Sequence, residues 1–401
     1  MSMTPIPRCP CRPTLPRAVR LRVALVVALV ACGAREAVAQ PTPAVPAAPR
    51  PAPATSLANL EFDDGSFTSF SAFFENDVLP HLGRNQDRNY TYGVALQASG
   101  TFIRKARLDT PLTALDALSG MRRAHATSGR RFYTLLTFAT GFTPDTLNTT
   151  AAVRDDRPYA SIVGASVRRL TVNDKSWDRA WASELAVGVL GLDVVGDLQT
   201  KIHRWNRRRS GKETPYDPLG WPNQISHGGE PTALYRASYE RRLFGDESGP
   251  DVRKHWQVVG GAMASVGYYT NLSLLSTARV GWFSSEFWEF SPGAMGLANQ
   301  NLGHGKRRKP NWELFLYGGT RPKVVAYNAM LQGQFRESAH TVTPRRLVAE
   351  WEGGIAAFVP WIRTQLVWQV AQGRSPEFEG SRRTHTWGSL LAVFSWPTKQ
   401  P

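Results

Sequence analysis

The stretch Tyr92-Gly93-Val94-Ala95-Leu96-Gln97-Ala98-Ser99-Gly100-Thr101-Phe102 decides the class of fold. Apolar side chains stand at Tyr92, Val94, Leu96, Ala98 and Phe102, and the positions between them carry glycine, alanine, glutamine, serine or threonine. Successive side chains of a strand point to opposite faces, so this period of two predicts a strand with one apolar and one small, polar face. We therefore expect a β-protein.

The same alternation recurs along the chain. Candidate strands lie near 66–74, 90–102, 132–142, 160–172, 180–191, 232–244, 255–266, 272–284, 312–320, 324–335, 346–358, 361–371 and 384–396. The period alone fits a soluble sandwich or a lipid-embedded barrel. The strand lengths, the Trp and Tyr residues near strand ends and the export signal described below favour an all-β, transmembrane antiparallel up-and-down β-barrel.

The number of candidate strands is odd, whereas bacterial single-chain barrels have even numbers. We therefore expect about twelve strands, with one run that is not a strand or two runs that form one bent strand.

The N-terminus has the layout of a secretory signal. Three arginines between Arg17 and Arg22 precede the apolar run Val23–Cys32, which is too short to span a membrane as a helix. Ala37-Val38-Ala39 is a small-x-small cleavage site, so residues 1–39 are predicted to be a signal peptide. Leu29–Cys32 also fits a lipoprotein cleavage box, which leaves lipidation at Cys32 as the alternative. Both interpretations predict export.

Two domain-level expectations follow from composition. Residues 40–65 form a spacer rich in proline and alanine, which stays extended and builds no core, and residues 66–401 are predicted to form the barrel. All three cysteines, Cys9, Cys11 and Cys32, precede the predicted cleavage site. A barrel closed by its own hydrogen-bond ladder has little need of disulfides.

The formal net charge is +16, and part of the excess lies in the leader. The rest is concentrated in predicted loops, at 122–131, 204–212 and 306–309. No recognisable nucleic-acid module accompanies these basic residues, so we expect no nucleic-acid partner. An anionic glycolipid surface is an equally good partner for such loops, and simple solvation of loop charge explains them as well.

Strand order predicts which polar segments meet. If the first strand leaves the periplasm, the connections at 75–90, 143–159 and 192–231 all lie on the outer rim. The connection at 103–131 is long for a periplasmic turn, and we expect a short helix there.

Two of the outer connections carry residue types that could perform chemistry. Asn76, Asp77 and Asp87 offer hard oxygen ligands of the kind that calcium prefers, although turn-forming residues look the same. Gln199 and His203 stand four apart, on one face if that segment is helical, and a histidine can act as general base. A single histidine is more often structural than catalytic. No Gly-x-Ser-x-Gly elbow, metalloprotease helix or phosphate loop occurs.

Taken together, these motifs resemble one family, the outer-membrane lipid A 3′-O-deacylases. The resemblance covers roughly residues 66 to 396. It is carried by Glu75-Asn76-Asp77, Asp87-Arg88-x-Tyr90-Thr91-x-Gly93, Thr143-Pro144, Asp156-Arg157-Pro158-Tyr159-Ala160, Gln199-x-x-x-His203, Gly220-Trp221-x-x-Gln224 and Ser375-Pro376-Glu377-Phe378.

The resemblance implies a twelve-stranded barrel in the outer membrane of a Gram-negative bacterium, with a calcium-dependent site at the outer rim between barrel wall and loops. It implies hydrolysis of the ester-linked acyl chain at the 3′ position of lipid A, within lipopolysaccharide. His203 would be the general base, Asp77 would ligate Ca²⁺, and Asn76 and Thr91 would help build the catalytic site. Gln199 would support the His203 segment and, with Arg154 and Arg157, bind the substrate. We expect a monomer that contacts outer-membrane lipids.

One departure from the family pattern concerns the substrate. The family has adjacent basic residues shortly after the Thr-Pro step, whereas this chain has Asp145–Thr150 there and no basic residue before Arg154. The basic run Arg204–Arg209, which we interpret as part of a loop, is expected to grip lipid A phosphates or inner-core acids instead. Two other functions are kept open. They are a barrel of the same fold without hydrolase activity, structural or for transport, and a phospholipase-like barrel with a serine nucleophile.

Overall fold

The computed structural model describes residues 67–76, 92–126, 129–173, 177–210, 217–247, 252–290 and 311–395. The predicted signal peptide, the spacer and the site residues Asp77 and Thr91 lie outside these ranges.

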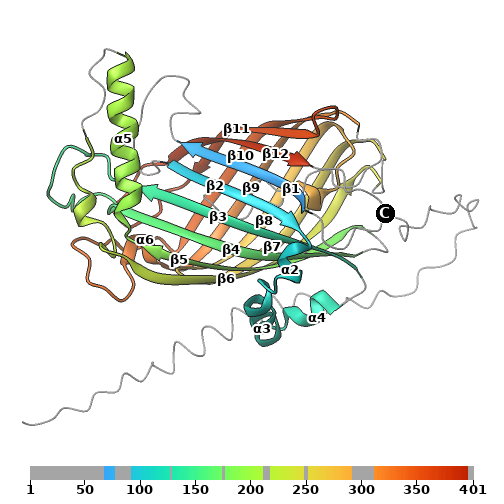
Figure 1. Ribbon diagram of the computed structural model, residues 1–401, viewed down its shortest axis with the longest axis horizontal. Helices are drawn as coiled ribbons and strands as arrows, with labels where there is room; N and C mark the ends of the chain where they lie inside the picture. Colours follow the sequence, from blue (N-terminus) through green and yellow to red (C-terminus); the bar gives the residue numbers. More distant parts are fainter. Residues whose placement is uncertain are drawn as a thin grey trace, which may run out of the picture.

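Twelve antiparallel strands form a closed barrel in which every strand pairs with its sequence neighbours and β1 pairs with β12 (Figure 1). The strands are β1 (Phe67–Asn76), β2 (Tyr92–Gly100), β3 (Gly129–Phe142), β4 (Ala160–Asn173), β5 (Arg179–Leu190), β6 (Glu230–Gly245), β7 (Lys254–Gly267), β8 (Tyr269–Phe283), β9 (Glu313–Asn328), β10 (Leu347–Val359), β11 (Thr364–Arg374) and β12 (His385–Ser395). The predicted fold class is confirmed. Among the described residues, no helix has the length and apolar character needed to cross a membrane.

Two of the predicted runs, 312–320 and 324–335, are one strand. β9 continues through Pro322 to Asn328, and its alternation of buried and exposed side chains keeps the same phase on both sides of the proline. Its pairing with β10 is also continuous, with Pro322 opposite Ala349. The end of the second run is a helical turn, α6 (Ala329–Gln332), capped by the Asn328 side chain, which accepts a hydrogen bond from the Met330 amide.

The faces of the strands follow the predicted alternation. On β2, Leu96 points outward and is 53 % exposed, whereas Gln97 points into the lumen and is buried. On β6, Arg236 points inward and pairs with Glu184 of β5 at 2.9 Å. An apolar exterior with a polar interior is the arrangement of a lipid-embedded barrel. Phe102 departs from the predicted strand, because β2 ends at Gly100 and Phe102 begins helix α2.

The connections divide between two ends of the barrel. The end that we call outer carries 77–91, 143–159, 191–229, 329–346 and 375–384, as the strand order requires. It contains helix α5 (Asp193–Ser210) and the turn η3 (Trp221–Asn223). The inner end carries α2 (Phe102–Lys105), α3 (Thr110–Ser119) and α4 (Met121–Ala126), so the expected helix in 103–131 is confirmed as three, and η4 (Phe287–Glu289) follows β8.

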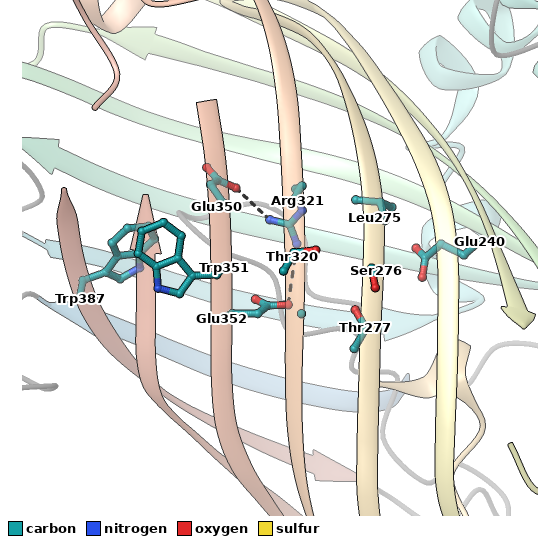
Figure 2. Close-up of a pocket in the computed structure, with 11 residues that line it drawn as sticks. Glu240, Leu275, Ser276, Thr277, Thr320, Arg321, Glu350, Trp351, Glu352 and Trp387 are labelled. Atoms are coloured by element: carbon teal, nitrogen blue, oxygen red, sulfur yellow. Dashed lines mark hydrogen bonds and ion pairs between the residues drawn. The ribbon is translucent and has the colours of Figure 1, made fainter. Parts of the chain in front are cut away.

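The lumen contains a network of buried charges. The Glu350 carboxylate is within 3.3 Å of the Arg321 guanidinium (Figure 2). This carboxylate lies 2.6 Å from the Lys323 ammonium. It also accepts a hydrogen bond from Arg374 Nε at 2.7 Å. Arg374 pairs in turn with Glu377, which lies 3.4 Å from Arg157. Each of these side chains is at least 80 % buried, so none lines a wide aqueous channel.

Replacing Glu350 by alanine should destabilise the barrel strongly, because three buried cations lose their shared carboxylate. Breaking a buried ion pair from one side costs about 3–5 kcal/mol. We expect a lower unfolding temperature in the heat-modifiability assay, which follows barrel unfolding on detergent gels. Glu337→Ala removes an exposed carboxylate and serves as the control. Equal unfolding temperatures for the two variants would contradict this role of Glu350.

Candidate active site at the outer wall

A row of four residues on neighbouring strands marks the site. Asn76 ends β1 and pairs with Tyr92 of β2, Tyr92 pairs with Gly141 of β3, and Gly141 pairs with Ser161 of β4. Directly opposed residues on neighbouring strands share one face of the sheet. This face is the outer one, because Phe74, two residues before Asn76 on the same side, is 40 % exposed toward the lipid. The row therefore lies on the outside of the barrel, at its outer end.

Helix α5 covers this row. The Tyr92 hydroxyl donates a hydrogen bond of 2.6 Å to the Val195 carbonyl oxygen. The helix approaches so closely that a Cβ on Gly141 would come within 2.7 Å of Val195 Cγ1, so a larger residue there would force the Val195 side chain or the helix to shift. The contact explains why Tyr92 is buried, 3 % exposed, although it shares the outward face with the lipid-facing residues of β2.

The segment around η3 holds the helix in place. The Trp221 ring donates through Nε1 to Gln199 Oε1 at 2.8 Å and stacks edge-on against Tyr159. A Cβ on Gly196 would lie 2.6 Å from the Trp221 ring, so this glycine lets helix and indole meet. Gln224 donates to Asp193 Oδ1 at 3.0 Å, at the start of α5.

The adjoining connection 143–159 is tied to the same segment. The Ile225 amide donates to the Tyr159 carbonyl oxygen at 2.8 Å, and the Leu219 amide donates to the Leu147 carbonyl oxygen at 2.8 Å. The Asp156 carboxylate accepts from the Asp145 amide at 2.9 Å and lies 3.0 Å from Arg383. This carboxylate thus links the start of the 143–159 connection to Arg383.

The path of α5 brings its later residues toward β1. Leu192, just before the helix, is 3.1 Å from the Ser161 hydroxyl of β4, and Val195 contacts Gly141 of β3 and Tyr92 of β2. The next strand in this direction is β1, which ends at Asn76. Gln199 and His203 follow Val195 at intervals of four residues on the same helix face, and both are buried.

Gln199 carries an unused donor. Its Oε1 accepts from Trp221, whereas its buried Nε2 has no hydrogen-bond partner among the residues the structure describes. A buried amide N–H without a partner costs free energy, and such groups occur where a ligand or a water completes the bond. The face of α5 that meets the wall therefore offers a donor at Gln199 and an imidazole at His203.

The predicted site residues divide into two groups. The structure brings Asn76, Gln199 and His203 to the outer face of the wall, at the same end of the barrel. Asn76 is paired there with Tyr92, and Asp77 and Thr91 are the sequence neighbours of these two residues. It does not bring Arg157 there. That side chain enters the lumen, over the Phe142 ring and next to Glu377, and burial lowers its pKa to about 10 although Glu377 opposes the shift. Arg154 is exposed on the 143–159 connection.

The basic run after His203 is not a loop. Helix α5 continues through it to Ser210, because Arg204–Arg209 contains no helix breaker. Arg204 is exposed on the helix and pairs with Asp217 at 3.0 Å. The basic residues are thus part of a helix.

Sequence analysis missed several residues of the site. Tyr92 was assigned to the lipid-facing set, yet it is the residue that binds α5. Trp221 and Gln224 belonged to a motif without an assigned role, and Gly141 gave no signal. For Trp221 and Gln224, the motif Gly220-Trp221-x-x-Gln224 was the available hint.

Residues from 33 to 396 match the model of a single family, described as outer membrane protein LpxR. Among solved structures the chain is similar to LpxR from Salmonella typhimurium, with 15% identity and a TM-score of 0.59. The match covers 82% of this chain and 100% of that chain. It is also similar to the β-domain of the Bordetella autotransporter Brka, at 10% identity and a TM-score of 0.35, over 82% of this chain and 99% of that chain. No curated protein matches it. Since the family model spans most of the chain, this outer-membrane barrel belongs to the outer membrane protein LpxR family.

Proposed function

We propose that the protein is a calcium-dependent hydrolase that removes the 3′ ester-linked acyl chain of lipid A. One observation carries the proposal. The helix that bears Gln199 and His203 packs on the lipid-facing side of the wall, with Tyr92 bound to its Val195 carbonyl oxygen. A site on this side is reached from the membrane and not from the lumen, and a membrane glycolipid is the substrate class that it suits.

The chemistry assigned to these residues is general-base hydrolysis. His203 takes a proton from a water molecule, and the water oxygen attacks the ester carbonyl carbon. The bond from that carbon to the sugar oxygen then breaks, and His203 passes the proton to the departing sugar oxygen. The products are a free fatty acid and a sugar hydroxyl. A positioned base contributes about 10²–10⁴-fold to such a step. The unused Gln199 Nε2 is suited to donate to the substrate or to the water.

Calcium would be held where β1 and β2 meet the outer rim. Asn76, half-buried at the end of β1, supplies a neutral oxygen of the kind that Ca²⁺ binds, and Asp77 and Thr91 would add a carboxylate and a hydroxyl. Asp77 would supply the negative charge of this ligand set. When bound, the cation would stabilise negative charge on the ester oxygen.

The transport alternative is disfavoured by the lumen. Buried ion pairs from Arg157 through Glu377 and Arg374 to Glu350 cross its interior, and the exposed fraction of each of these side chains is 9 % or less.

The serine-nucleophile alternative finds little support in the described residues. Ser183, His125 and Asp116 do meet, beneath α3 and α4 at the inner end, but Asp116 Oδ2 accepts from the serine itself at 2.9 Å. In a catalytic triad the carboxylate holds the other imidazole nitrogen, which here meets Thr171 at 2.7 Å. Burial, with Arg169 and Arg131, lowers the pKa of His125 to about 3, which makes it a poor base.

Replacing His203 by glutamine should abolish deacylation while the barrel still folds, because the amide cannot take up a proton. We expect a loss of about 10²–10⁴-fold, measured from the mass of lipid A in cells that express the full chain. The wild type should remove one acyloxyacyl group. His255→Gln changes an exposed histidine at the inner end and should retain activity. Wild-type activity in the His203 variant would contradict the assignment of His203 as the general base.

Trp221→Phe tests how Gln199 is positioned. The variant keeps an aromatic ring against Tyr159 but removes the N–H that binds Gln199. Loss of one hydrogen bond costs about 0.5–1.5 kcal/mol, so we expect kcat to fall a few-fold to tenfold at an unchanged unfolding temperature. Trp312→Phe, at an exposed tryptophan, is the control. A fall in unfolding temperature without a change in kcat would point to a structural role alone.

Asp77→Asn should raise the calcium concentration that half-maximal activity requires, by tenfold or more, because the ligand set loses its charge. Titration of chelator-treated membranes with Ca²⁺ measures the shift. Asp155→Asn removes an exposed carboxylate from a neighbouring outer connection and should leave the titration unchanged. Full activity of the wild type in excess chelator would contradict the calcium requirement.

A further inference from the structure

Helix α5 carries a stripe of exposed apolar side chains. Val194 is 57 % exposed, Leu198 40 %, Ile202 38 % and Trp205 57 %. These positions follow one another at intervals of four, four and three residues, so they fall within about 80° of each other around the helix. Val194, Leu198 and Ile202 form an exposed apolar row on an outer connection, and such a patch marks an interaction surface.

The helix has three faces and not two. Val195, Gln199 and His203 form the buried stripe against the wall. Asp193, Asp197, Lys201, Arg204 and Arg208 form an exposed polar stripe, again within about 80°. The apolar stripe lies between them, with Ile202 next to Val195 and Val194 next to Lys201 around the helix. Such an order suits a helix that meets protein, lipid and water at once.

The place of the helix in the barrel identifies the apolar partner. α5 crosses the outer strand ends and does not run along them (Figure 1), so its axis follows the membrane plane. It also starts directly after β5, whose Val187 is 53 % exposed in the lipid-facing belt, and it passes over β2, whose Leu96 is 53 % exposed. The stripe is therefore continuous with the belt that acyl chains already cover. A helix with a basic polar face and an apolar face lies in a membrane interface in this way.

We propose that α5 is an interfacial helix whose apolar side chains Val194, Leu198 and Ile202 are immersed among the acyl chains of the outer leaflet. Its polar stripe, with Lys201 and Arg204, then faces the anionic head groups and water. Resting on the proposed function, a second step follows. Because the apolar stripe adjoins the face that holds Gln199 and His203, an acyl chain of the substrate reaches the site along this stripe, sideways from the membrane.

Immersion is tested with spin labels in outer membranes. Cys9, Cys11 and Cys32 are the only cysteines of the chain, so a full-length background with alanine at these positions accepts single labels. Labels at Leu198→Cys and Ile202→Cys should be relaxed by oxygen, which concentrates in lipid, and protected from a water-soluble nickel chelate. Labels at Asp197→Cys and Lys201→Cys, on the same helix, should behave in the opposite way. Equal accessibility to the nickel chelate at all four positions would overturn the proposal.

The entry path is tested by activity. Leu198→Asp puts a charge on the stripe and should lower deacylation of membrane lipid A by tenfold or more. Leu219→Asp, at an exposed leucine of the same connection outside the stripe, should retain most of it. Equal activity in the two variants would exclude entry along the stripe. The label experiment does not depend on turnover, so an inactive wild type would refute the hydrolase and leave the immersed helix standing.

Discussion

A strand surrounded by lipid must find hydrogen-bond partners for its backbone within the protein, and the pairing of β1 with β12 meets this demand by leaving no open edge. In a closed barrel one face of the wall meets acyl chains and the other meets the lumen. Apolar and polar side chains therefore alternate along every strand. Closure also sets the order of the outer connections, and so decides that α5, which follows β5, begins beside β4 and β3.

The outer wall serves two purposes along its length. Around Leu96 it is plain apolar surface for lipid, but at the outer end it becomes small or polar at Asn76, Gly141 and Ser161. Such residues would be poor lipid contacts, and α5 covers the row that they form. The outward-facing positions of the strands thus form both the lipid-facing belt and the surface on which α5 packs at the candidate site.

The lumen has a separate role. Its buried charges are paired within the barrel, and the Glu350 carboxylate contacts Arg321, Lys323 and Arg374 at the same time. Arg157 belongs to this interior network although it precedes Tyr159, which packs on the outer side against Trp221. Two residues that are close in sequence, Arg157 and Tyr159, therefore belong to the lumen network and to the candidate site, respectively.

Sequence alone was sufficient for the class of fold, the positions of nearly all strands and the side of the barrel on which the outer connections lie, because period-two patterning and strand order are local properties. It also singled out Gln199 and His203 by their helical spacing. It could not decide that 312–320 and 324–335 are one strand, that Tyr92 faces a helix and not lipid, or that Arg157 enters the lumen. Those outcomes depend on contacts between segments far apart in the chain, such as Tyr92 with Val195 and Trp221 with Gln199, and only the closed barrel brings these segments together.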